Sequence, residues 1–265
     1  MQLVTIAFSH YNEKARWGLD RFGVDYEDRR YLPMLHFFGV MWATRLRGGS
    51  SERHSTRWST PLLLTDDGTR IHDSSRIVRY ASDRFGTEHT SLYPAEHATR
   101  IEQIEQRVGE RLGPHTRRIA YYYLLAEPKR LAWLMRNNTG RVQNGLYTAL
   151  SPGIRFALRR ALGVNRPAME ASRARVRAEV DTLSAELGDR PYLLGDRFTA
   201  ADLAASCMLA PMLAPSLEEG YSARLPSPDD RPAELAPFIE EVRQSPIGRH
   251  ALRMFARERR PPSPP

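Results

Sequence analysis

The position of the strand-forming segments is the strongest constraint on the fold of this chain, because all of them precede Pro94. β-prone apolar runs occur at 3–8, 24–31 and 59–72, whereas the periodic segments after Pro94 are helical. A block of strands followed by a block of helices indicates two structural units. With 265 residues, the chain is long enough for two modest domains.

The first unit starts as a β-α-β arrangement. A strand at 3–8 leads directly into a helix at 12–22, and a second strand is expected at 24–31. The segment 33–57 predicts a short helix followed by a loop, since Gly48-Gly49-Ser50-Ser51 has the composition of a flexible linker.

A hairpin led by a proline follows. The segment 59–65 predicts a strand, and Asp66-Asp67-Gly68 is a turn of the Asp-Gly type. The returning strand is expected at 69–72, after which Asp73 or Ser74 caps a helix.

Pro61 has no backbone N–H to give to a sheet, so it belongs at the first residue of a strand or beside a functional loop. A cis Thr60–Pro61 bond would turn the backbone of Thr60 outward, where it could pair with a peptide-like ligand.

The second unit is predicted to be entirely helical. Its expected helices cover 95–125, 128–148, 152–163, 168–187, 199–214 and 233–256. Thr199 and Asp202 form a capping box at the start of a helix that is apolar nearly all round, which is typical of a central buried helix. Cys207 on that helix is expected to be a core thiol. The proline-rich, basic segment 257–265 is expected to be a disordered tail.

The turn from the first strand into the first helix, Phe8 to Trp17, carries the chemistry. Unpaired N–H groups and the helix dipole at such a helix start favour an anion, including a thiolate. Ser9 lies in the turn, where its hydroxyl could donate to a sulfur. Alternatively, Ser9 is only a helix cap, and Glu13, Lys14 and Arg16 form a solvated helix face.

Composition excludes several other classes of function. The net charge of +8 comes almost wholly from arginines spread along the chain, so we expect no nucleic-acid partner. With Cys207 as the only cysteine, an internal disulfide is impossible and a cysteine-based metal cluster is not expected. His36 and His54 have no second ligand at suitable spacing, which makes them surface histidines and predicts no metal.

The N-terminus lacks the pattern of a signal peptide, and no apolar run approaches the length of a membrane span. We therefore expect a cytoplasmic protein without membrane association. One alternative treats the basic amphipathic segment 155–162 as a helix on a membrane surface.

The order of these motifs resembles the glutathione transferase superfamily. Ser9 to Trp17 is similar to the active-site turn and first helix, and Thr60-Pro61-Leu62-Leu63 to the cis-proline strand. Asp73-Ser74-Ser75-Arg76-Ile77 resembles the element that holds the γ-glutamyl end of glutathione, and 192–202 resembles the family's helix-capping motif.

The resemblance implies a thioredoxin-like N-terminal domain, residues 1–88, followed by a helical-bundle domain, residues 95–256. It also implies a homodimer with glutathione as co-substrate in the cleft between the domains. By position, Ser9 would hold the glutathione thiolate, with Tyr11 and Asn12 as alternative donors. Thr60 at the Pro61 strand would pair with the cysteinyl part.

The same resemblance assigns Asp73 and Ser74 to the γ-glutamyl amine and carboxylate. No cysteine occurs at position 9 or 12, which excludes disulfide exchange by this turn. The expected function is therefore glutathione transfer to a hydrophobic electrophile, as in detoxification. The alternative is a non-catalytic protein of the same fold that carries a hydrophobic or planar acidic ligand, such as a tetrapyrrole.

The segment 113–167 fits the family only loosely. It contains the aromatic run Tyr121-Tyr122-Tyr123 together with Trp133, Tyr147 and Phe156. These side chains either widen an aromatic pocket for the second substrate or serve ordinary helix packing.

Overall fold

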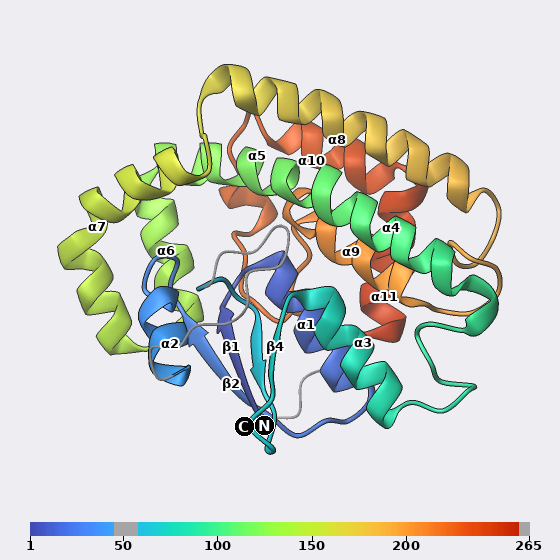
Figure 1. Cartoon of the computed structure of the whole chain (residues 1–265). Helices are drawn as coiled ribbons and strands as arrows, with labels where there is room; N and C mark the ends of the chain where they lie inside the picture. The colour runs from blue at the N-terminus through green and yellow to red at the C-terminus, as the bar shows by residue number, and fades with distance from the viewer. Residues whose placement is uncertain (45–57, 260–265) are drawn as a thin grey trace.

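A mixed four-stranded sheet organises the N-terminal part of the molecule (Figure 1). The computed structural model describes residues 1–44 and 58–259. Within these ranges the strands are β1 (Gln2–Ile6), β2 (Glu27–Tyr31), β3 (Leu62–Leu64) and β4 (Arg70–His72). They lie in the order β2-β1-β3-β4, with β1 parallel to β2 and antiparallel to β3. The expected β-α-β unit and proline-led hairpin are confirmed.

Helices cover both faces of this sheet. The three helices of this part are α1 (His10–Arg21), α2 (His36–Ala43) and α3 (Ser74–Phe85). Since side chains alternate along a strand, Leu3 and Leu63 pack against α1 and α3, while Val4 and Leu62 pack with Val40 of α2. A Cβ on Gly18 would lie 2.7 Å from Val78 Cγ2, so glycine at this position allows α1 and α3 to approach closely.

The rest of the described chain is helical. Its α-helices are α4 (Ala98–Arg111), α5 (Gly113–Ala126), α6 (Pro128–Asn138), α7 (Arg141–Ala161), α8 (Arg166–Leu187), α9 (Ala200–Leu213), α10 (Ala236–Gln244) and α11 (Pro246–Glu258). The short 3-10 turns are η1 (Ala95–His97) and η2 (Pro228–Asp230). The expected class, a small α/β unit followed by an all-α unit, is confirmed.

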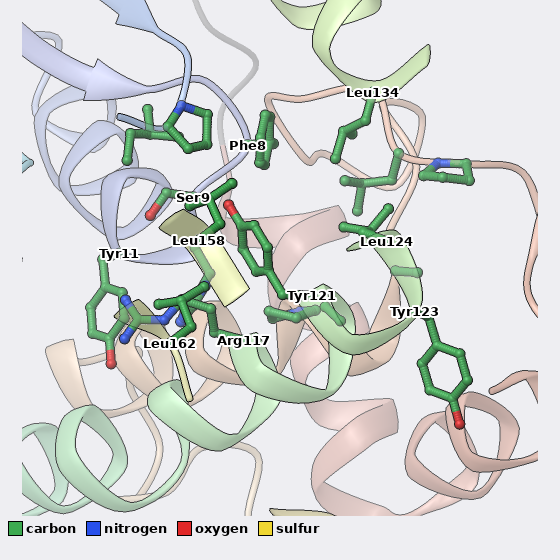
Figure 2. Close-up of a pocket in the computed structure, with 18 of the residues that line it drawn as sticks. Phe8, Ser9, Tyr11, Arg117, Tyr121, Tyr123, Leu124, Leu134, Leu158 and Leu162 are labelled. Atoms are coloured by element: carbon green, nitrogen blue, oxygen red, sulfur yellow. The ribbon is translucent and has the colours of Figure 1, made fainter. Parts of the chain in front are cut away.

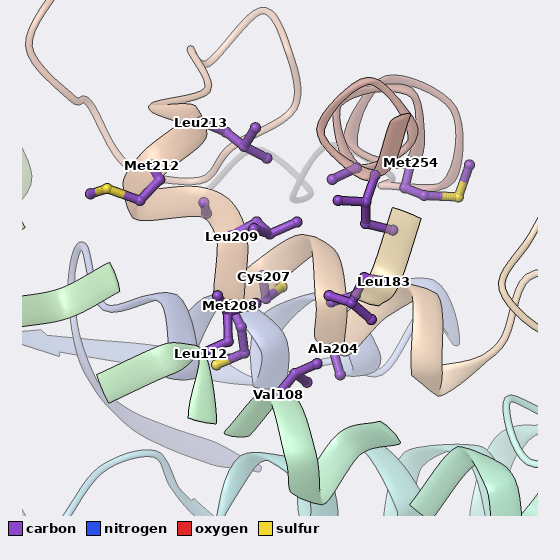
Figure 3. Close-up of a cluster of buried hydrophobic side chains, with 14 of the residues drawn as sticks. Val108, Leu112, Leu183, Ala204, Cys207, Met208, Leu209, Met212, Leu213 and Met254 are labelled. Atoms are coloured by element: carbon purple, nitrogen blue, oxygen red, sulfur yellow. The ribbon is translucent and has the colours of Figure 1, made fainter. Parts of the chain in front are cut away.

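Helix α9 is the centre of the helical core, as predicted (Figure 3). Its capping box is present, and the Asp202 carboxylate accepts the N–H groups of Thr199 at 3.0 Å and Leu193 at 2.8 Å. Cys207 is completely buried, and burial raises the pKa of its thiol well above the usual value. It is a core thiol.

Several predicted helix bounds were wrong, and prolines explain most of the differences. The helix expected at 95–125 breaks at Leu112, and the one expected at 233–256 breaks at Ser245. Pro114 and Pro246 lie in the first turns of the helices that follow, where a missing N–H costs nothing. Pro152, by contrast, lies inside α7 without ending it. Side chains on both sides of it are buried in one cluster with α5 and α6, and this packing holds the helix together.

Two further expectations concern the linker and the tail. The expected linker, Gly48 to Ser51, lies outside the described residues. His54, which was expected to be a surface histidine, also lies outside them. The tail was expected to be disordered from residue 257, but α11 continues to Glu258 and Arg259 is buried. The remaining tail, 260–265, is likewise not described. Among the described helices, none has both the length and the apolarity to cross a membrane.

Helix α1 connects the two parts of the molecule. Nine of its twelve residues are buried, because one face packs on the sheet and the other contacts α9. Glu13, Lys14 and Arg16 are among the buried residues, so the alternative of a solvated helix face is wrong. These charged side chains are paired with charged groups from distant segments.

Candidate functional site

A cavity of about 390 Å³ lies where the start of α1 meets the helical part (Figure 2). Its walls come from the β1–α1 turn, the segment 33–37, Ser59 and Thr60, and from helices α5, α6, α7, α9 and α10 with the loop after α9. Most of the lining side chains are aliphatic or aromatic. The cavity therefore suits an apolar ligand that reaches the β1–α1 turn.

Ser9 is the N-cap of α1 and lines this cavity. Its backbone is extended, at φ −78° and ψ 127°, and its side chain makes no capping hydrogen bond. Within the described part of the chain, the Ser9 hydroxyl has no hydrogen-bond partner. The N–H groups of the first turn of α1 add a positive field at the same place. The turn thus offers a free hydroxyl donor to a bound anion.

Tyr11 also lines the cavity, but its hydroxyl is engaged elsewhere. It donates to the carbonyl of Gly109 on α4 at 2.8 Å, and burial raises its pKa to about 12. Figure 2 shows this hydroxyl directed away from Ser9. The ring therefore forms part of the wall, and the hydroxyl anchors α1 to α4.

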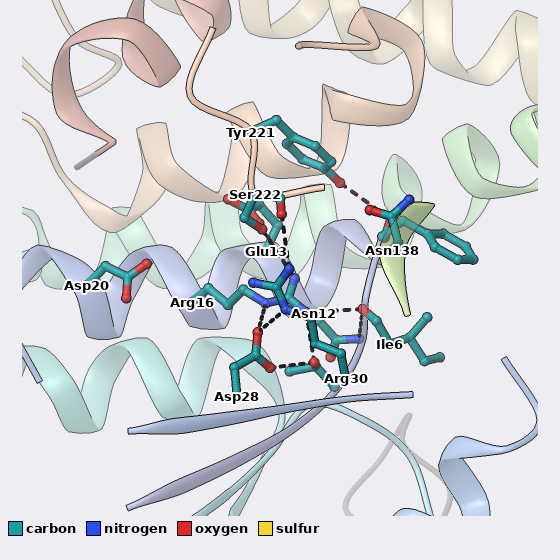
Figure 4. A network of polar contacts seen from close by, with 12 residues as sticks. Ile6, Asn12, Glu13, Arg16, Asp20, Asp28, Arg30, Asn138, Tyr221 and Ser222 are labelled. Carbon is teal, nitrogen blue, oxygen red and sulfur yellow. Dashed lines mark hydrogen bonds and ion pairs between the residues drawn. The ribbon is translucent and has the colours of Figure 1, made fainter. Parts of the chain in front are cut away.

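Asn12 does not line the cavity; it is completely buried beneath the turn (Figure 4). Its amide nitrogen donates to the carbonyl of Ile6 at 3.2 Å and to Thr60 Oγ1 at 3.4 Å. Asn12 therefore holds the turn against the segment that precedes β3. The structure brings Ser9 and Thr60 together at the cavity and places Asn12 behind them.

The Thr60–Pro61 peptide bond is cis, and Thr60 lines the cavity. In the part of the chain described here, neither the N–H nor the carbonyl of Thr60 makes a backbone hydrogen bond. Both groups are free to pair with an extended peptide. Pro61 itself is buried and does not line the cavity.

Asp73 and Ser74 form the N-terminus of α3 and lie outside the cavity walls. Asp73 has φ +75°, an unusual conformation for a residue with a side chain, and local strain of this kind is frequent at ligand sites. Its Oδ1 accepts the N–H groups of Ser75 at 2.8 Å and Arg76 at 3.4 Å. Ser74 is buried. Asp73 lies near enough to Tyr11 to contribute to its raised pKa.

Lys14 supports the start of α3, although the sequence suggested for it only a place on a solvated helix face. Its buried ammonium lies 2.5 Å from Ser75 Oγ and 2.8 Å from Glu105 Oε1. It thereby ties α1 to the start of α3 and to α4. Only the partners, which are 61 and 91 positions away in the sequence, reveal the role of Lys14.

Two histidines of the cavity wall were also missed. His36 was expected on the surface, but it is buried because α2 turns it toward the cavity, and burial lowers its pKa to about 4. His10 is buried as well, and burial together with the nearby Arg117 lowers its pKa to about 3. Both imidazoles are therefore neutral at physiological pH. Among the described residues, no group of three potential metal ligands occurs.

The aromatic run of α5 contributes in part to the cavity. Tyr121 and Tyr123 line it, and Figure 2 shows the phenol of Tyr121 pointing toward Ser9. Tyr147 is buried in the neighbouring cluster with Leu131 and Leu158, whereas Phe156 is exposed. No sequence pattern indicates that Arg117 of α5 lines the cavity, because only the tertiary fold brings it beside Tyr11.

Comparisons with known proteins agree with this architecture. A family model described as the glutathione S-transferase C-terminal domain matches residues 166–241, which include α8 and α9. No curated protein sequence matches the chain.

Among solved structures, a glutathione S-transferase of Ceriporiopsis subvermispora in complex with glutathione is 18% identical. The alignment covers 99% of each chain with a TM-score of 0.62. The β-etherase LigF of a Sphingobium strain is 17% identical, with 95% of this chain and 98% of that chain covered and a TM-score of 0.58. Glutathione transferase F7 of Populus trichocarpa is 14% identical, with 96% and 98% covered and a TM-score of 0.54. Similarity at these identities establishes the fold: a thioredoxin-like unit followed by a helical bundle, as predicted.

Proposed function

We propose that this chain, which has the glutathione S-transferase fold, binds glutathione at the β1–α1 turn and transfers it to a hydrophobic electrophile. The observation that carries the proposal is the free hydroxyl of Ser9 at the start of α1, open to an apolar cavity. A transferase needs a donor to the sulfur and a hydrophobic space beside it, and the two occur together here.

In the proposed complex, the Ser9 hydroxyl donates to the glutathione sulfur, and the positive end of α1 stabilises the thiolate. A free thiol titrates near 8.5, so a lower pKa increases the fraction of nucleophile at neutral pH. The thiolate forms a bond to the electrophilic carbon, whose leaving group departs with the bonding electron pair. The thiol proton passes to solvent when the thiolate forms.

The peptide part of glutathione would lie along Thr60 and the start of α3. The free backbone N–H and carbonyl of Thr60 can pair with the cysteinyl residue, as two strands pair. Both capping bonds of Asp73 involve Oδ1, which leaves Oδ2 for the γ-glutamyl ammonium. Ser74 would bind the γ-glutamyl carboxylate. This assigns glutathione to an N-terminal domain of residues 1–88 and the electrophile to the cleft formed with the helical domain, residues 95–256.

Calorimetric titration with glutathione tests the proposal, followed by conjugation of 1-chloro-2,4-dinitrobenzene. We expect saturable binding of one glutathione per chain and turnover above the uncatalysed rate. If glutathione does not bind at millimolar concentration, the proposal is wrong.

The second candidate is a non-catalytic carrier of a planar acid such as a tetrapyrrole. The aromatic walls of the cavity and its arginines favour this function. It predicts tight binding of porphyrins without affinity for glutathione, so the same titration separates the two candidates.

The setting of the protein is also part of the proposal. We propose a cytoplasmic homodimer that acts in detoxification; the homodimer and the detoxification role follow from the resemblance. The single, buried Cys207 suits a reducing compartment, since it leaves no pair of cysteines to form an internal disulfide. Sedimentation equilibrium measures the mass of the assembly, and a monomer mass at micromolar concentration would contradict the dimer.

A further inference from the structure

The cavity next to Ser9 is positively charged. Arg117, Arg130 and Arg231 line it, and none of the described residues in its lining is an aspartate or glutamate. Arg130 forms an ion pair with Glu127. Arg117 and Arg231 have no carboxylate partner anywhere in residues 1–44 and 58–259. Two cationic groups in an apolar hollow attract and concentrate anions.

Arg231 lies on the helical side of the cavity. Its only hydrogen bond in the described chain is to the carbonyl of Ala214 at 3.4 Å, and its Nε is buried without a partner. Burial and the neighbouring Arg243 lower the pKa of Arg231. The carboxylates of Glu219 and Glu240 offset this decrease only in part. Neither forms an ion pair with Arg231 among the described residues, although a charge that is partly withdrawn from water needs a partner to offset its lost hydration.

Arg117 lies closer to the β1–α1 turn. Its guanidinium carbon is 5.8 Å from the centre of the Tyr11 ring, and it makes no hydrogen bond to the described residues. Figure 2 shows it beside Tyr11 and Leu162, while Tyr121, four positions along α5, points toward Ser9. A ligand that lies between these two α5 side chains would contact the Arg117 guanidinium at one end and the thiol site near Ser9 at the other.

We propose that the second substrate is an electrophilic aromatic carboxylic acid whose carboxylate binds Arg117. Arginine is suited to this task because its planar guanidinium can donate two parallel hydrogen bonds to a carboxylate. The leucines and tyrosines of the wall would contact the aromatic ring. The inference rests on the proposed function only for the claim that the bound acid reacts with glutathione.

Binding is tested without glutathione. Calorimetry compares 2-naphthoate with 2-naphthamide, which have nearly the same shape but differ in charge, on the full chain at pH 7.5. The variants are Arg117→Gln and, as a control of equal charge change, Arg111→Gln, because Arg111 is exposed at the end of α4 and does not line the cavity.

We expect the wild type and Arg111→Gln to bind the acid about tenfold or more tightly than the amide. Arg117→Gln should bind both with similar affinity. Equal affinities in the wild type would overturn the inference even if Arg117→Gln failed to fold. A preference for the acid that persists in folded Arg117→Gln would overturn the role of Arg117.

Reactivity is tested with glutathione and a second matched pair, 4-chloro-3-nitrobenzoate and 4-chloro-3-nitrobenzamide. In each, the glutathione sulfur bonds to the chlorine-bearing carbon and chloride leaves with the electron pair. We expect the benzoate-to-benzamide ratio of kcat/KM to fall about tenfold or more in Arg117→Gln. Comparison of this ratio between the wild type and Arg117→Gln cancels the intrinsic difference in reactivity between the two compounds.

The two tests separate the inference from the function on which it rests. If the acid binds preferentially through Arg117 but neither chloronitro compound is conjugated, the proposed transferase function fails and the acid is a ligand, not a substrate. If both compounds are conjugated with an unchanged ratio in Arg117→Gln, the transferase function holds and the assignment of the substrate class fails.

Discussion

Ser9, Tyr11 and Asn12 show how three neighbouring polar residues acquire different surroundings. The hydroxyl of Ser9 is free at the cavity, that of Tyr11 donates to Gly109, and the amide of Asn12 supports the turn from below. The extended backbone at Ser9 followed by helical backbone determines these directions. Of the three, only Ser9, at the N-cap, has its polar group free at the cavity among the described residues.

This difference predicts the effects of two single-atom changes on turnover. Ser9→Ala should lower kcat/KM for 1-chloro-2,4-dinitrobenzene by roughly tenfold or more, because a hydrogen bond to a charged sulfur contributes about 1.5–3 kcal/mol. Tyr11→Phe should change it by less than about threefold, since that hydroxyl is bonded to Gly109. Steady-state kinetics at pH 7 measures both values of kcat/KM. A larger decrease in Tyr11→Phe than in Ser9→Ala would contradict the assignment of Ser9 as the donor to the sulfur.

At the scale of elements, α9 and α1 position the site. Asp202 at the start of α9 accepts the N–H groups of Leu193 and Thr199, and lies 3.0 Å from His250 Nε2. It thus fixes the start of the central helix to the preceding loop and to α11. Tyr11 and Lys14 then connect α1 to α4, which contacts α9.

Asp202→Ala should therefore lower the free energy of unfolding by about 2–4 kcal/mol, because it leaves two buried N–H groups without acceptors. The matched control is Asp189→Ala, since Asp189 is exposed in the loop after α8 and should cost less than about 0.5 kcal/mol. Denaturant unfolding measures both. Equal small losses would show that the capping box does not stabilise the fold.

The local motifs were predictable for a physical reason: each is specified by residues close together in the sequence. The Asp-Gly turn, the cap at Asp73 and the box of Thr199 and Asp202 are of this kind. The cavity is not, because it depends on contacts between distant segments. The bond from the Tyr11 hydroxyl to the Gly109 carbonyl spans 98 positions, and no local sequence pattern indicates it.

The same reason explains the errors. Arg117 and His36 have no local signature that distinguishes them from surface residues, and packing alone brings them to the cavity. Whether Asn12 donates to a bound sulfur stays a prediction, because the sequence shows its spacing from Ser9 but not the direction of its amide.

At the scale of the whole molecule, a buried polar network at α1 joins the first strand to the last described residue. Figure 4 shows its part around Arg16 and Glu13. Arg16 donates to Asp28 at 2.8 Å and to Thr5 Oγ1 at 2.7 Å. On the other side, Arg259 lies 2.9 Å from a carboxylate oxygen of Glu13 and 2.6 Å from one of Asp20. The last described residue thus closes the network.

Removal of Arg259 should destabilise the whole fold. Arg259→Ala leaves the completely buried Glu13 carboxylate without this partner, so we expect a loss of about 3–5 kcal/mol. Arg257→Ala removes an exposed arginine two positions earlier and should change stability by less than about 0.5 kcal/mol. If thermal unfolding shows the same midpoint temperature for both variants, the ion pairs of Arg259 do not stabilise the fold.

Two of the buried histidines, His10 and His36, make the fold sensitive to acid. Burial lowers the pKa of His10 to about 3 and that of His36 to about 4, whereas both titrate near 6.5 in the unfolded chain. Below pH 6.5 the unfolded state therefore binds more protons, and stability decreases as the pH falls. Each histidine should cost roughly 2 kcal/mol between pH 7 and pH 5.

The comparison of His10→Gln with the exposed control His89→Gln isolates this effect. The loss of stability between pH 7 and pH 5 should shrink in His10→Gln and stay unchanged in His89→Gln, as measured by denaturant unfolding at each pH. An unchanged pH dependence in His10→Gln would mean that its imidazole is not held neutral by the fold.

The central claim is that the β1–α1 turn stabilises the thiolate of glutathione through Ser9. The most direct measurement is a pH titration of the ultraviolet absorbance of the thiolate of bound glutathione, in the wild type and in Ser9→Ala. We predict a thiol pKa near 7 in the wild type and a return by about one unit or more toward the free value of about 8.5 in Ser9→Ala. Equal pKa values in the two proteins, or a wild-type value no lower than that of free glutathione, would contradict the claim.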